Sequence, residues 1–114
     1  MPTDKVIIKL YSVEYAALFG HLHKISTHTG QLGLNSTVSH MVLYDLFWRK
    51  GHTIECNAKS KKSKPRSITL KPVEAKALYD ELRPHSYTDV LLCQIFGHLD
   101  RALLNLGFNN TLMY

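Results

Sequence analysis

The chain has 114 residues, of which 45% are hydrophobic and 20% are charged, with a formal net charge of +5. This length predicts a single domain, residues 1–114, that is large enough to bury a core without disulfides. The composition is that of a globular protein and excludes a membrane-spanning helix, because no apolar run approaches the roughly 18 residues that cross a bilayer.

The first predicted element is a half-buried strand at residues 5–11, where side chains alternate between two faces. One face carries Val6, Ile8 and Leu10, and the other carries Lys5, Ile7, Lys9 and Tyr11. From Ser12 the apolar residues take helical spacing instead. This change predicts a helix that ends at about Thr27, followed by a loop at residues 29–33.

A second helix is predicted to begin at a cap on Asn35 or Ser36 and to end near Lys50, with Gly51 just beyond it. Its many apolar residues indicate burial on most sides; they include Val38, Met41, Val42, Leu43, Leu46, Phe47 and Trp48. Alternation resumes at residues 52–58 and again at residues 66–71. We interpret these two runs as the arms of a β-hairpin.

Two further helices are predicted in the C-terminal half. Pro72 and Glu74 suit the first turn of a third helix, which must stop before Pro84. A fourth helix is predicted from about Ser86, with Asp89 three residues on, as in a variant capping box. It extends to Gly107, and its apolar stripe consists of Leu92, Ile95, Phe96, Leu99, Leu103 and Leu106. Of these we expect Leu92, Phe96, Leu99 and Leu103 to line the core.

The chain also resembles itself. Residues 6–22 align without a gap with residues 66–82, with seven identities that include Ile8/Ile68 and Glu14/Glu74. We interpret residues 5–50 and 66–107 as two copies of a strand–helix–helix unit, joined by strand 52–58. The predicted fold class is α+β, with a small three-stranded, mostly antiparallel sheet and about four helices packed on one face.

Five cations lie close together in the predicted hairpin loop, with no acid among them: Lys59, Lys61, Lys62, Lys64 and Arg66. The other nine Lys and Arg residues offset the nine Asp and Glu residues, so this loop accounts for the net charge. Such a loop attracts phosphates without reading a base sequence. The alternative interpretation is a solvated loop whose lysines aid solubility.

No catalytic or metal-binding motif stands out. The seven histidines lack the spacing of zinc motifs, although His21 and His28 share a helix face, so we predict no metal and no cofactor. Cys93 with His98, or Cys56 with His52, could be written as a dyad, but buried, unreactive thiols are the simpler interpretation. Two cysteines are too few for a disulfide-dense secreted scaffold. The apolar run at the N-terminus is too short for the core of a signal peptide, so we expect a cytoplasmic location.

The sequence therefore favours a small non-enzymatic binding protein. We expect it to dock on a larger protein partner as an accessory subunit, regulator or inhibitor, and we expect no membrane partner. The alternative is a nucleic-acid-associated protein anchored by the basic loop at residues 59–66. A third interpretation is a small hydrolase or metal protein that uses the histidines. The oligomeric state stays open.

Overall fold

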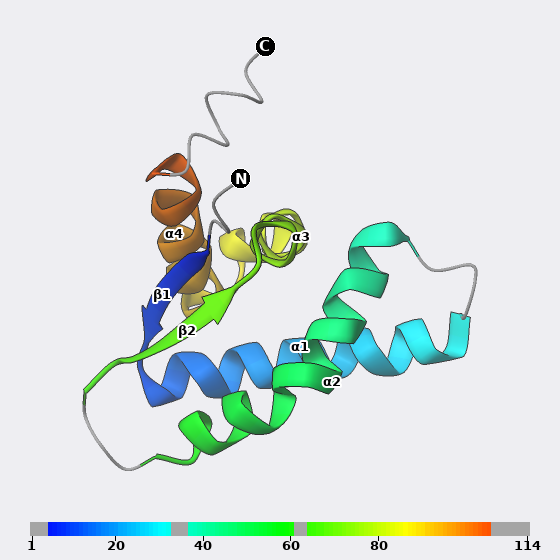
Figure 1. Ribbon diagram of the computed structural model, residues 1–114, viewed down its shortest axis with the longest axis horizontal. Helices are drawn as coiled ribbons and strands as arrows, with labels where there is room; N and C mark the ends of the chain where they lie inside the picture. Colours follow the sequence, from blue (N-terminus) through cyan, green and yellow to red (C-terminus); the bar gives the residue numbers. More distant parts are fainter. Residues whose placement is uncertain (1–4, 33–36, 61–63, 106–114) are drawn as a thin grey trace.

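The computed structural model describes residues 5–32, 37–60 and 64–105 (Figure 1). In chain order the elements are β1 (Val6–Leu10), α1 (Ser12–Leu32), α2 (Val38–Ala58), β2 (Arg66–Leu70), α3 (Pro72–Leu82), the short 3₁₀ helix η2 (Pro84–Tyr87) and α4 (Val90–Asn105). β1 and β2 form a two-stranded antiparallel ribbon. α1 and α3 each pack against both α2 and α4, and α4 also packs against β1.

The prediction of a third strand is wrong. Residues 52–58 are the last turns of α2, and the described residues contain a sheet of two strands only. The helical period governs this segment: buried Leu43 and Ile54 are eleven residues apart, which is about three helical turns. Gly51 does not end the helix but lies inside it, where a Cβ atom would be 3.5 Å from the Phe47 ring. Residues 59–65 therefore join a helix to a strand and form no hairpin loop.

Several helix ends also differ from the sequence prediction. α1 continues to Leu32, through the predicted loop. The proposed caps Asn35 and Ser36 lie outside the described residues, and the cap of α2 is Thr37, whose hydroxyl accepts a hydrogen bond from the His40 N–H at 3.2 Å. α3 begins at Pro72 and stops before Pro84, as predicted.

α4 begins later than predicted, at Val90, because residues 84–87 form η2. Asp89 is therefore not inside the first turn, as predicted, but caps α4: its Oδ1 accepts hydrogen bonds from the N–H groups of Leu91 and Leu92 at 3.0 and 3.1 Å. The predicted core positions Leu92, Leu99 and Leu103 are buried, whereas Phe96 is only partly buried. Phe96 stacks on Tyr79 of α3 with ring centroids 4.6 Å apart.

The core lies between one face of the ribbon and the helices. Its largest fully buried side chains are Leu10, Tyr15, Leu18, Leu22, Leu43, Leu46, Ile54, Leu70, Leu78, Leu82, Ile95 and Leu99. α2 is less buried than predicted, because Val38, Met41 and Trp48 are exposed. None of the described helices combines the length and the apolar character that crossing a bilayer requires.

The two halves of the chain share structural details, while their common origin stays a prediction. Ile8 pairs directly with Ile68, its counterpart in the alignment. Glu14 and Glu74 are both 2% exposed, and each accepts a hydrogen bond from the backbone N–H of the residue three positions earlier, at 2.8 and 2.9 Å. Each carboxylate also meets a nitrogen-bearing side chain from the other half: His98 at 3.3 Å from Glu14, and Arg49 in contact with Glu74.

Candidate functional site

The outward face of the β1–β2 ribbon carries polar and cationic side chains. Because side chains alternate along a strand, burial of Val6, Ile8 and Leu10 turns their neighbours away from the core. Ile7 stands opposite Thr69, and Lys9 stands opposite Ser67. Val6 pairs with Leu70, so the flanking Lys5 and Lys71 approach one another at one end of the ribbon. We call this surface the ribbon face; it consists of Lys5, Ile7, Lys9, Ser67, Thr69 and Lys71.

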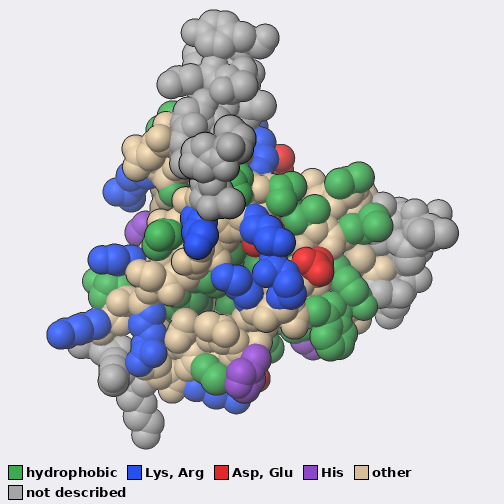
Figure 2. Space-filling view, viewed as in Figure 1, with side chains coloured by type: hydrophobic (Ala, Val, Ile, Leu, Met, Phe, Trp, Pro, Cys, Tyr) green, Lys and Arg blue, Asp and Glu red, His purple; other side chains and the backbone are tan. Residues whose placement is uncertain are grey.

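Further cations border the ribbon face. The Lys50 ammonium of α2 donates a hydrogen bond to the Thr69 carbonyl oxygen. Burial, followed by the positive charges of Arg49 and Lys5, lowers the pKa of Lys50, which places these cations in one electrostatic neighbourhood. In Figure 2, Lys and Arg side chains gather on the side of the molecule that displays the two strands.

The ribbon-face lysines are available to a ligand. Arg49 contacts buried Glu74 and also pairs with Asp45 at 3.1 Å, so its charge is compensated within the protein. Within residues 5–32, 37–60 and 64–105, by contrast, no carboxylate forms an ion pair with the three lysines of the ribbon face. Their charge is therefore directed to solvent or to a partner.

The predicted basic loop leads into this surface. Lys59 caps the C-terminus of α2 and pairs with Glu55 at 3.5 Å. Lys64 is exposed, and exposed Arg66 opens β2 opposite Leu10. Lys61 and Lys62 lie outside the described residues. Sequence reasoning found this contiguous run but missed the ribbon-face lysines, which are far apart in the chain and meet only through strand pairing.

The histidines form a second polar group that the sequence did not predict. The Nε2 atoms of His21 and His40 lie 3.0 Å from Oε2 and Oε1 of Glu81, respectively, and His85 Nε2 lies 3.5 Å from Oε2. The hydrogen bond from His21 lowers the pKa of Glu81; burial acts in the opposite direction, and His40 adds to the lowering. We call these four residues the histidine cluster.

The two Cys/His pairs considered from sequence differ in the structure. Cys56 Sγ and His52 Nε2 are 3.6 Å apart, one helical turn along α2. His98 pairs with Glu14 rather than with Cys93. Both thiols are free and exposed, so the prediction that they are buried is wrong. The reason at Cys56 is the helix itself, which turns this residue away from buried Ile54.

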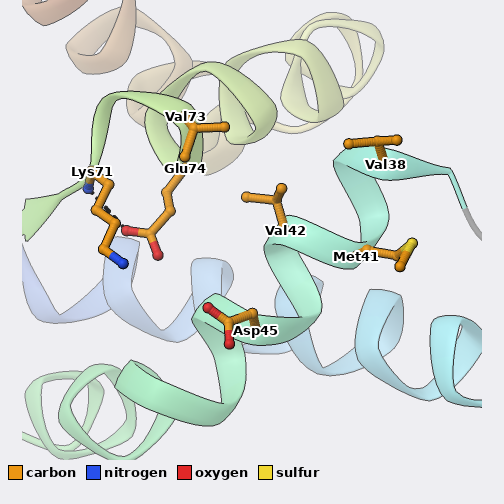
Figure 3. A pocket seen from close by; sticks show the side chains of 7 residues that line it. All are labelled: Val38, Met41, Val42, Asp45, Lys71, Val73 and Glu74. Atoms are coloured by element: carbon orange, nitrogen blue, oxygen red, sulfur yellow. Dashed lines mark hydrogen bonds between the residues drawn. The ribbon is translucent and has the colours of Figure 1, made fainter.

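A shallow apolar groove separates the beginnings of α2 and α3 (Figure 3). Its volume is about 330 Å³, and its lining consists of Val38, Met41, Val42, Asp45, Lys71, Val73 and Glu74. Val38 and Val73 are 77% and 57% exposed. The groove thus presents aliphatic side chains to solvent, with Glu74 and Lys71 at one end.

No protein-family model, curated protein or solved structure matches the chain.

Proposed function

We propose that this protein binds duplex DNA through the ribbon face. The observation that carries the proposal is the exposed two-stranded antiparallel ribbon whose outward side chains include three lysines and two hydroxyls. The major groove of B-DNA, about 12 Å wide, admits a two-stranded β-ribbon, whereas the major groove of A-form RNA is too deep and narrow for side chains to read. Duplex DNA is therefore the nucleic acid that fits this shape.

The outward side chains match the chemistry of the groove. Lysine donates to phosphates or to the O6 and N7 acceptors of guanine, and the Ser67 and Thr69 hydroxyls donate to or accept from several base edges. Ile7 offers an apolar contact for a thymine methyl group. Exposed Lys64 and Arg66 lie at the start of β2, where they add sequence-independent attraction to the backbone.

Exposed apolar residues favour binding over a merely solvated sheet face. One face of an antiparallel sheet is commonly solvated, and such a face carries mainly polar side chains. Here Ile7, the second residue of β1, is 58% exposed, and Tyr11 and Val13 beyond the strand are 50% and 57% exposed. Exposed apolar side chains that lie together mark a surface that a partner covers. The uncompensated lysines around them attract a partner of negative charge.

Removing two ribbon-face charges should weaken DNA binding. We expect the double variant Lys9→Ser/Lys71→Ser to lose roughly 10- to 100-fold in affinity near 0.1 M salt, because two phosphate contacts and their counterion release disappear. The measurement is fluorescence anisotropy of a labelled mixed-sequence duplex. The matched control, Lys24→Ser/Lys76→Ser, removes the same charge from α1 and α3 and should stay within about threefold. If both double variants lost the same affinity for DNA, the loss would come from net charge alone and not from the ribbon face.

Docking on a larger protein is a second candidate, which the exposed aliphatic groove between α2 and α3 favours. An apolar helix or loop of a partner would bury Val38, Met41 and Val73 there. Met41→Lys separates the two candidates, since this change should abolish partner binding in the groove and leave DNA binding intact. Loss of DNA binding in Met41→Lys would contradict a separate groove function.

A further inference from the structure

The histidine cluster brings four side chains together from four elements: His21 of α1, His40 of α2, Glu81 of α3 and His85 of η2. One nitrogen from each of His21 and His85 and one oxygen of Glu81 all lie within 4.8 Å of one another. Imidazole nitrogen and carboxylate oxygen are ligands that zinc and related divalent ions prefer. This donor set differs from a surface group of acids because two of its three donors are imidazoles.

The distances from the two imidazoles to the Glu81 carboxylate are close to those in a tetrahedral site. Bonds of about 2.0–2.1 Å place the ligand atoms of a tetrahedral zinc site about 3.3–3.4 Å apart. Nε2 of His21 and Nε2 of His85 lie 3.0 and 3.5 Å from the same Glu81 oxygen, Oε2. The His21 and His85 rings approach edge to face, with centroids 4.7 Å apart. Small side-chain rotations therefore suffice to place the three donors around one ion.

The surroundings suit a metal site that solvent can reach. The His21 side chain is only 10% exposed and Glu81 is 18% exposed, whereas His85 is 42% exposed on the short η2 helix. His85 thus marks an entry path for the ion. His40 lies 3.0 Å from the other Glu81 oxygen, Oε1, where its hydrogen bond fixes the carboxylate orientation, as the outer partners of metal ligands do.

We propose that His21, Glu81 and His85 bind a divalent transition-metal ion, preferentially zinc, and that His40 orients the Glu81 carboxylate. Bound metal would tie α1 to α3 and η2, which belong to different halves of the chain. Three protein ligands leave a fourth tetrahedral position for water. The proposal is independent of DNA binding, because none of these residues belongs to the ribbon face.

Zinc binding is measured by calorimetric titration of chelator-treated protein with zinc chloride, and its geometry by the visible absorption of the cobalt(II) form. We expect one ion per chain and a tetrahedral cobalt spectrum without a thiolate charge-transfer band. His21→Gln and His85→Gln each remove a ligand and should lower the affinity for zinc at least about tenfold. His40→Gln should also lower it about tenfold or more, because the Glu81 carboxylate is then no longer held in orientation. The control His23→Gln, on the exposed side of α1, should bind as the unchanged protein does.

Three results would overturn the site. The first is the absence of stoichiometric zinc binding by the folded protein, and the second is zinc binding that persists in both His21→Gln and His85→Gln. A thiolate band that Cys56→Ser removes would move the ion to the His52/Cys56 pair and equally refute the proposal. Circular dichroism establishes that each variant is folded, and His85→Gln answers the question if the more buried His21→Gln does not fold.

Discussion

Raising the salt concentration from 50 to 200 mM should weaken duplex DNA binding by roughly 500-fold. Five exposed cations carry this expectation: Lys5, Lys9, Lys64, Arg66 and Lys71. Each phosphate contact contributes about −0.9 to the slope of log affinity against log salt, so five contacts give a slope near −4.5. The measurement is the anisotropy titration repeated at several salt concentrations with the same duplex.

The slope of log affinity against log salt also shows how many phosphate contacts a substitution removes. Lys9→Ser/Lys71→Ser should reduce the slope to about −2.7, because two of the five contacts are lost. The control Lys24→Ser/Lys76→Ser should keep the full slope. A slope near zero for the unchanged protein, or the same slope for both double variants, would contradict binding by the ribbon-face lysines.

Truncating a buried side chain of α4, the helix that packs against the ribbon, should cause a large loss of stability. Leu99 of α4 is fully buried, and α4 packs against β1, α1 and α3. Leu99→Ala should lower the free energy of unfolding by about 3 kcal/mol, within the roughly 2–5 kcal/mol seen when a buried leucine is truncated and leaves a cavity. Denaturant unfolding followed by circular dichroism measures this change.

A neighbour on the same helix provides the control. Leu104 is 44% exposed, and Leu104→Ala should cost no more than about 1 kcal/mol, since both residues favour a helix and little buried surface is lost. If Leu99→Ala also cost less than about 1 kcal/mol, the packing of α4 against the ribbon would be refuted. If the two variants lost equal stability, burial would not explain the loss.

Local patterns predicted both strands found in the described part of the chain, including which side chains face outward. Alternation at residues 5–11 placed Val6, Ile8 and Leu10 on the core side, and the structure confirms their burial. The same kind of pattern misled at residues 52–58, because a short run that alternates can also lie on a helix. Gly51 was interpreted as the end of α2, although it lies inside the helix, where even a Cβ atom would make only an ordinary contact with the Phe47 ring.

The wrong third strand also hid the candidate site. If residues 66–71 pair with residues 52–58, Lys71 has no reason to lie near Lys5 or Lys9. Pairing of β1 with β2 brings these lysines onto one surface across about 60 residues of sequence. The histidine cluster could not be predicted either, because His21, His40 and Glu81 lie on three helices that only tertiary packing brings together.

The most direct test of the central claim is to map the duplex on the protein by NMR. ¹⁵N-labelled protein is titrated with an unlabelled mixed-sequence DNA duplex, and amide shifts are followed residue by residue. DNA binding through the ribbon face predicts that the largest shifts occur at Ile7, Lys9, Ser67 and Thr69, with small shifts at Val38 and Met41 in the groove. Large shifts confined to the groove, or no shifts at low salt, would contradict the proposal that the ribbon face binds DNA.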